Sequence, residues 1–234
     1  MNDVRTAIRW AHEAGSLVFL DAVHYAAHAP IDVQSWGCDF LVCSAYKFFG
    51  PHVGVLWGRR ELLESLPAYK VRPAPDKAPG RWMTGTQNHE GLAGVAAAVE
   101  YLRTIGAASE PAADRRCQLR TALTAILAYE ASLGQRLLEG LSMRPWFKVW
   151  GIKQPARITE RVPTVSITLP DRPAAELAQH LAVRKIYAWH GNMYALSLTE
   201  RLGLEDGGGF LRLGLVHYNT AEEIDCLLAA LDEL

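Results

Sequence analysis

The chain has 234 residues, half of them hydrophobic, and a formal net charge of −1. This length supports a sizeable core in one or two domains, and the near-neutral charge gives no reason to expect nucleic acid or membrane binding. No apolar run is long enough to span a bilayer and the N-terminus lacks a signal-peptide layout, so we expect a cytoplasmic protein.

The first part of the chain alternates helical and strand-like patterns. Residues 3–14 have helical spacing, and Gly15 follows as a helix stop. Strand-like apolar runs come next, at residues 16–20, 39–43 and 53–57. Alternation of helix and buried strand predicts a parallel α/β sheet.

An irregular stretch and a long helix complete this first part. Residues 67–82 contain four prolines and several charges, which predicts a loop. Residues 88–105 have the apolar spacing of an amphipathic helix. The pattern is then interrupted at residues 106–114. We therefore predict a domain boundary there, between residues 1–107 and 108–234.

The second part of the chain mixes helices and strands without the βαβ alternation. Helical patterns are predicted at 115–141, 173–183, 193–202 and 220–233, and strand-like patterns at 146–150, 162–169, 186–189 and 210–217. This order predicts a compact α+β domain. The four cysteines form no CxxC pair and the eight histidines no HExxH motif, so no metal site is expected.

Charged and polar residues stand where two neighbouring strands are predicted to end. Asp21 ends the first apolar run, and Ser44 and Lys47 follow the second. In a parallel sheet, ligands gather beyond the carboxyl ends of the strands. A lysine amine and a carboxylate at one site form the pair that pyridoxal phosphate requires, as Schiff-base residue and as partner of the pyridine nitrogen.

Four motifs in order resemble the class V aminotransferase family, and most closely its cysteine desulfurase-like branch. They are Asp21-Ala22-Val23-His24, Ser44-x-x-Lys47, Thr84-Gly85-Thr86-Gln87-Asn88 and the run from Arg212 to Thr220. The resemblance implies an α/β protein of the PLP-dependent transferase fold type I, with part of the large domain, its sheet mainly parallel, and a small C-terminal α+β domain. It implies pyridoxal 5′-phosphate (PLP) as cofactor.

The resemblance also assigns roles around the cofactor ring. Lys47 would be the catalytic Schiff-base residue, and its amine would move protons at the substrate α-carbon. Asp21 would pair with the pyridine nitrogen and keep it protonated. His24 would donate to the ring hydroxyl.

Phosphate and substrate contacts follow from the remaining motifs. The resemblance implies that the Ser44 hydroxyl contacts the cofactor phosphate. It also implies that Thr86 contacts the phosphate bound by a neighbouring subunit, and hence a homodimer. Tyr46 stands where the desulfurase branch usually has histidine and would donate through its phenol. Arg212 would hold the α-carboxylate of an amino-acid substrate through its two-pronged guanidinium.

The sequence departs from the desulfurase pattern at the nucleophile. The corresponding loop is 189–195, before Arg201-Leu202-Gly203, and Tyr194 occupies the place of the active cysteine. Persulfide formation needs a thiolate, and none of the four cysteines is near this loop in the sequence. We therefore do not expect ordinary cysteine desulfurase activity.

The chain also looks N-terminally truncated, because the resemblance begins inside the family's large domain. Three interpretations stay open. The first is a PLP-dependent enzyme acting on an amino acid by transamination, elimination or epimerisation. The second is a catalytically inactive fragment, and the third is a subunit that pairs with a separate N-terminal half.

Overall fold

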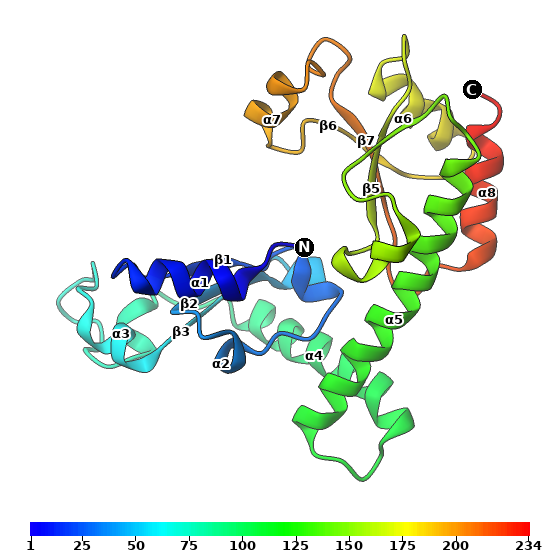
Figure 1. Cartoon of the computed structure of the whole chain (residues 1–234). Helices are drawn as coiled ribbons and strands as arrows, with labels where there is room; N and C mark the ends of the chain where they lie inside the picture. Colours follow the sequence, from blue (N-terminus) through cyan, green and yellow to red (C-terminus); the bar gives the residue numbers. More distant parts are fainter. The chain divides into compact units, whose positions relative to one another are not determined.

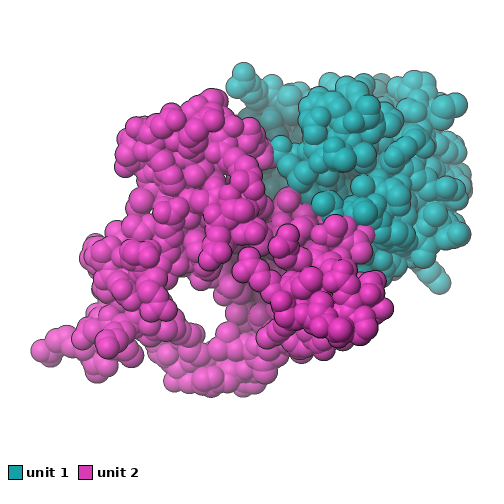
Figure 2. Space-filling view, turned by 60° about the horizontal axis from the view of Figure 1, so that its bottom comes forward, with its two compact units in different colours: residues 1, 126–234 teal, residues 2–125 magenta.

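The computed structural model describes residues 1–234, which divide into two compact units. One unit contains residues 2–125, and the other contains residues 126–234 together with Met1 (Figure 2). The division falls inside helix α5 (Arg115–Ser142), not in the interrupted segment at 106–114. A domain boundary at 107/108 therefore stays a prediction.

Helix α1 (Val4–Glu13) opens the 2–125 unit, as the sequence predicted. It begins at Asp3, whose carboxylate accepts a hydrogen bond from the Thr6 amide at 3.1 Å, and it is followed by Gly15 at φ 74°. Its buried residue Ile8 joins a core with three others, Ala22, Cys38 and Leu41.

Three strands form the sheet of this unit, in the order β1 (Phe19–Asp21), β2 (Phe40–Ser44) and β3 (Gly54–Gly58). Strands β1 and β2 are parallel, whereas β3 is antiparallel to β2. The connection at residues 45–53 is shorter than the dozen or so residues that a parallel crossover needs. The expectation of parallel strands therefore holds for β1 and β2 but not for β3.

The two faces of this sheet differ in what covers them. Leu41 of β2 packs in the core with α1, and Leu20 and Trp57 lie against the same core. On the other face, Phe19 and Leu56 keep 57% and 53% of their surface exposed. This second face is called the open face below.

Four further helices belong wholly or partly to this unit: α2 (Val33–Trp36), α3 (Arg60–Ser65), α4 (His89–Ser109) and the first part of α5 (Figure 1). Helix α4 matches the predicted amphipathic helix, while α2 and α3 are too short to show a helical period in the sequence. Residues 67–82 form the predicted loop, with one 3₁₀ turn, η3 (Gly80–Trp82).

The 126–234 unit has an antiparallel sheet in the order β4-β5-β7-β6. Its strands are β4 (Lys148–Trp150), β5 (Thr164–Thr168), β6 (Trp189–Gly191) and β7 (Phe210–Gly214). Its helices are the second part of α5, α6 (Ala174–Val183), α7 (Leu196–Arg201) and α8 (Ala221–Leu231), with a 3₁₀ segment, η4 (Pro155–Glu160). Leucines of α5, α6 and α8 share one core with β5 and β7, in the α+β arrangement that the sequence predicted.

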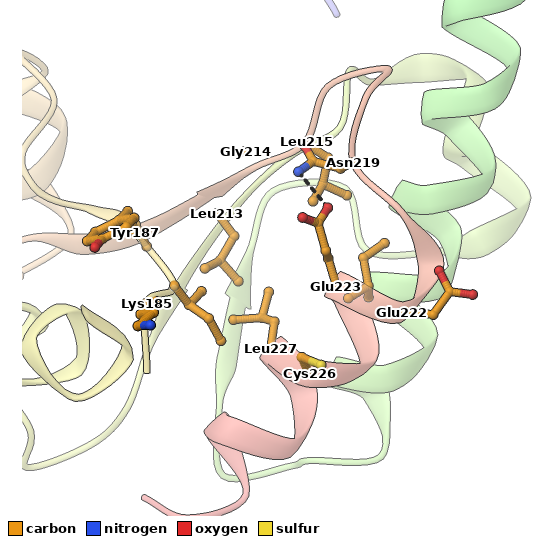
Figure 3. A pocket seen from close by; sticks show the side chains of 13 residues that line it. Lys185, Tyr187, Leu213, Gly214, Leu215, Asn219, Glu222, Glu223, Cys226 and Leu227 are labelled. Atoms are coloured by element: carbon orange, nitrogen blue, oxygen red, sulfur yellow. Dashed lines mark hydrogen bonds between the residues drawn. The ribbon is translucent and has the colours of Figure 1, made fainter. Parts of the chain in front are cut away.

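A pocket of about 350 Å³ lies in this unit between β7, residues 185–188 and the first turns of α8 (Figure 3). Leu213 and Leu227 give it apolar walls, and Glu223 accepts a hydrogen bond from Asn219 at 3.0 Å. Glu223 also completes the capping box of α8 with Thr220. None of the residues assigned to the cofactor or substrate lines this pocket.

Two further properties concern the chain as a whole. None of its helices combines the length and apolar character required to cross a bilayer. No three histidine, cysteine, aspartate or glutamate side chains gather in a way that would hold a metal ion.

Candidate active site

Asp21 and Ser44 end the two parallel strands of the 2–125 unit. Asp21 pairs in register with Val42, and Ser44 lies two residues further along β2. Because side chains in a strand alternate with a period of two, Asp21, Val42 and Ser44 project from the same face of the sheet. Asp21 is exposed and Ser44 half-buried. The carboxyl ends of β1 and β2 therefore bring a carboxylate and a hydroxyl to the same end of the sheet, as the sequence predicted.

Lys47 lies in the 3₁₀ turn η2 (Ala45–Phe48), which starts where β2 ends. Ala45 and Phe48 are buried and anchor the turn, while Lys47 is half-buried. After η2, Phe49 adopts φ 71° and the Gly50 amide donates to the Ala45 carbonyl at 2.8 Å. A Cβ on Gly50 would lie 3.1 Å from that carbonyl oxygen, so glycine suits this tight turn.

Tyr46 and His52 lie next to Lys47. The Lys47 Nζ atom is 4.8 Å from the centroid of the Tyr46 ring. That ring stacks on the His52 ring, with 4.9 Å between centroids and 15° between planes. The sequence singled out Tyr46 as a phenol donor, whereas the structure shows its ring in contact with an amine and an imidazole.

His24 follows Asp21 in the turn that enters the short helix η1 (Tyr25–Ala27). It is exposed, and its ring centroid lies 5.0 Å from that of His28. His28 is buried, which suits a structural histidine. His24 thus follows the carboxylate at the end of β1 by three residues. The resemblance puts a donor to the cofactor ring at this position.

Thr86 lies in the loop before α4 and is exposed. Helix α4 packs closely on the turn that carries Lys47, since a Cβ on Gly94 would lie 3.0 Å from the ring of Pro51. The loop with Thr86 thus leads into a helix that contacts the site. Its contact with the phosphate of a neighbouring subunit stays a prediction.

Arg212 belongs to the other unit, on strand β7, and is half-buried. Its register partners are Ser166 on β5 and Trp189 on β6. Its proposed grip on a substrate carboxylate stays a prediction.

The loop around Tyr194 has an unusual backbone. Met193 and Tyr194 both have positive φ, 54° and 62°, and the Tyr194 side chain is fully exposed. The Asn192 carboxamide accepts a hydrogen bond from the Tyr194 amide at 3.1 Å. A Cβ on Gly209 would lie 2.3 Å from the Gly191 backbone, so Gly209 closes tightly on the base of the loop. Two consecutive strained residues persist only when their surroundings fix them.

None of the four cysteines lies in this loop. Burial raises the pKa of Cys38 and of Cys43, both in the 2–125 unit. A hydrogen bond to Glu110 raises the pKa of Cys117. Cys226 is exposed on α8. The structure therefore offers no thiolate at the position of Tyr194.

Residues 1–227 match the family described as aminotransferase class-V. The chain belongs to this family. It is 30% identical to a cysteine desulfurase of Pectobacterium atrosepticum over 247 aligned residues, which cover all of this chain and 54% of the relative. It is 31% identical to a probable cysteine desulfurase of Streptomyces coelicolor, of which it covers 53%. The chain thus spans about half the length of the curated relatives it matches.

Solved structures of class-V relatives have the same fold. The cysteine desulfurase CsdA of Escherichia coli superposes with a TM-score of 0.78 and 29% identity, over 99% of this chain and 54% of that one. An apo cysteine desulfurase of Thermococcus onnurineus gives a TM-score of 0.82 at 24% identity, which supports the fold alone. The fold-type I assignment is confirmed.

The residues at the edge of the β1–β2 sheet fit PLP by their chemistry. An amine, a carboxylate, an imidazole and a hydroxyl come from one unit of this class-V chain, on Lys47, Asp21, His24 and Ser44. Sequence reasoning missed His52. The signal that could have indicated it is the Gly50-Pro51 pair, which predicts a turn that returns the chain towards Tyr46.

Proposed function

We propose that this chain is part of a PLP-dependent enzyme that acts on an amino acid through Lys47. One observation carries the proposal. Lys47 follows the end of β2, beside the strand that ends at Asp21. Membership of the class-V family supports it. A homodimer and a cytoplasmic location belong to the same proposal.

Each side chain has a defined task in this proposal. The Lys47 amine would bind the cofactor and then carry a proton to or from the substrate α-carbon. The Asp21 carboxylate would hold a proton on the pyridine nitrogen. Ser44 would donate its hydroxyl to the phosphate, and Arg212 would orient the substrate carboxylate. When bound, PLP supplies an aldehyde and an electron-withdrawing ring.

The reaction proposed excludes ordinary cysteine desulfuration. Relatives are named cysteine desulfurases, but Tyr194 is a phenol at the end of a strained loop and no thiol accompanies it. Sulfur transfer to the protein needs a thiolate nucleophile. Transamination, elimination and epimerisation need only the groups named above, so the substrate is an amino acid and the reaction one of these three.

The proposal is tested by trapping the cofactor on the chain. The purified protein is incubated with PLP, reduced with borohydride and digested, and the adduct is located by mass spectrometry. We expect the adduct on Lys47 in preference to the other five of the six lysines. Label spread over all lysines would contradict the proposal and favour an inactive fragment.

A matched pair of variants makes this test specific. Lys47→Arg should abolish the selective adduct. Lys148→Arg should leave it unchanged, although the Lys148 Nζ atom also lies over an aromatic ring, 3.7 Å from the centroid of Trp150. Unchanged total labelling in both variants would mean that labelling reflects general lysine chemistry.

A further inference from the structure

Three side chains meet at the turn after β2: Lys47, Tyr46 and His52. The 4.8 Å between the Lys47 Nζ atom and the Tyr46 centroid lies within the range of about 6 Å over which a cation is attracted to a ring face. The near-parallel stack of Tyr46 on His52 fixes the plane of that ring. Both rings are on the exposed side of the turn, whereas Lys47 is half-buried.

The backbone brings His52 to Tyr46 independently of Lys47. The Ala45 amide donates to the Val53 carbonyl at 2.8 Å, and the Gly50 amide donates to the Ala45 carbonyl at 2.8 Å. These two bonds close the segment on itself, so residue 52 lies beside residue 46. The Pro51 ring, which contacts α4, further restrains the turn.

We propose that Tyr46 and His52 are positioning residues for the Lys47 amine. The inference rests on the proposed role of Lys47. A lysine side chain has a flexible four-carbon stem and loses rotamer freedom when it is held in place. Contact with a ring that is itself fixed by a stack restricts the ammonium form of the side chain before any ligand arrives, and this ammonium passes its proton to solvent before the free amine reacts. A reacting group whose orientation is set in advance reacts faster.

The rate of selective adduct formation tests this role in the chain of residues 1–234. Tyr46→Leu and His52→Ala should each slow labelling of Lys47 by PLP by about two- to fivefold, the range expected for one exposed cation–π contact. Tyr46→Phe and His52→Phe keep the rings and should restore the rate. Tyr69→Leu removes an exposed tyrosine elsewhere in the unit and should have no effect. Equal rates in Tyr46→Phe and Tyr46→Leu would overturn the inference.

A second measurement needs no cofactor. Lysines are reductively methylated with ¹³C-formaldehyde, and the Lys47 resonance is identified by its loss in Lys47→Arg. Ring currents should displace this resonance from those of lysines that touch no ring, and Lys148 over Trp150 gives a positive control. Tyr46→Leu should abolish the displacement of Lys47 alone.

The labelling rate and the Lys47 resonance together distinguish two outcomes. Either Tyr46 and His52 do not position Lys47, or the proposed function itself is wrong. A displaced Lys47 resonance without a selective adduct would contradict the proposed function and leave the contact in place. A selective adduct with an undisplaced resonance would support the proposed function and overturn the inference that Tyr46 and His52 position Lys47.

Discussion

At the scale of single residues, Asp21 is the side chain whose chemistry is most specific to the proposed site. Its Oδ1 atom accepts a hydrogen bond from the Val23 amide at 2.9 Å, which fixes the carboxylate at the end of β1. Asparagine can accept the same bond through its carbonyl oxygen. The substitution therefore tests the negative charge and not the turn.

We expect Asp21→Asn to weaken cofactor binding. Loss of a hydrogen bond to a charged partner corresponds to about ten- to a hundredfold in affinity. The PLP concentration that gives half-maximal adduct on Lys47 should rise accordingly. Asp206→Asn, at an exposed position of the other unit, serves as control. An unchanged half-maximal concentration in Asp21→Asn would mean that this carboxylate does not contribute to cofactor binding.

At the scale of elements, helix α1 is tied to strand β2 by one buried acid. Asp39 Oδ2 lies 2.8 Å from His12 Nε2 on α1 and accepts the Val18 amide at 2.7 Å, and Arg59 Nε lies 3.5 Å from Oδ1. Burial acts to raise the pKa of Asp39, but the hydrogen bonds and the neighbouring positive charge outweigh it, so the pKa is lowered. His12 and Arg59 are partly exposed, so solvent weakens their contribution.

A lowered pKa in the folded state predicts loss of stability in acid. The ionised form of Asp39 stabilises the fold above the ordinary aspartate pKa of about 4, and this contribution disappears as the pH falls through the lower folded-state value. Asp39→Asn should reduce the free energy of unfolding near neutral pH by about 2 kcal/mol. In urea titrations the difference between the two proteins should shrink towards about pH 3. A difference that does not change with pH would mean that the charge is unimportant.

The same elements show how far the sequence predicts the structure. Long periodic segments such as α1, α4 and α5 were predicted close to their observed bounds. The β1 strand was expected at residues 16–20 but lies at Phe19–Asp21, because an apolar run does not specify which of its residues pair. The direction of β3 follows from its short connection to β2, a length that the predicted runs at 39–43 and 53–57 already contain, whereas the prediction of parallel strands rested on the alternation of helix and strand.

The candidate site was predictable where it depends on strand ends. Asp21, Ser44 and Lys47 follow apolar runs, and the sheet brings the first two to one edge. The stack of His52 on Tyr46 was not predictable in the same way. It depends on the positive φ of Phe49 and on two backbone hydrogen bonds, and the Gly50-Pro51 pair predicts a turn there without showing which side chains the turn brings together.

At the scale of the whole molecule, the open face of the β1–β2–β3 sheet, from which Asp21 and Ser44 also project, exposes large apolar side chains. Phe19 stacks on Phe40 at 6.0 Å, and Leu56 lies opposite Val42 on the same face. Contiguous apolar surface on a sheet favours association. The isolated chain should therefore self-associate as its concentration rises.

Polar substitutions on the open face should reduce this association. Phe19→Ser and Leu56→Thr should each raise the apparent dissociation constant by about tenfold, a change that corresponds to 1.4 kcal/mol. Sedimentation velocity over a dilution series measures this change. Tyr69→Ser alters an aromatic residue that is almost completely exposed outside the sheet and should leave the constant unchanged. Equal association of all the variants would place the contact surface elsewhere.

The loop that carries Tyr194 has a consequence for how this protein tolerates substitution. Gly209 and Asn192 fix the backbone, while the Tyr194 side chain is fully exposed. Exchange of this side chain for another unbranched one leaves no cavity and requires no repacking. Substitution at this position should therefore change the chemistry of the loop surface with little effect on the stability of the fold.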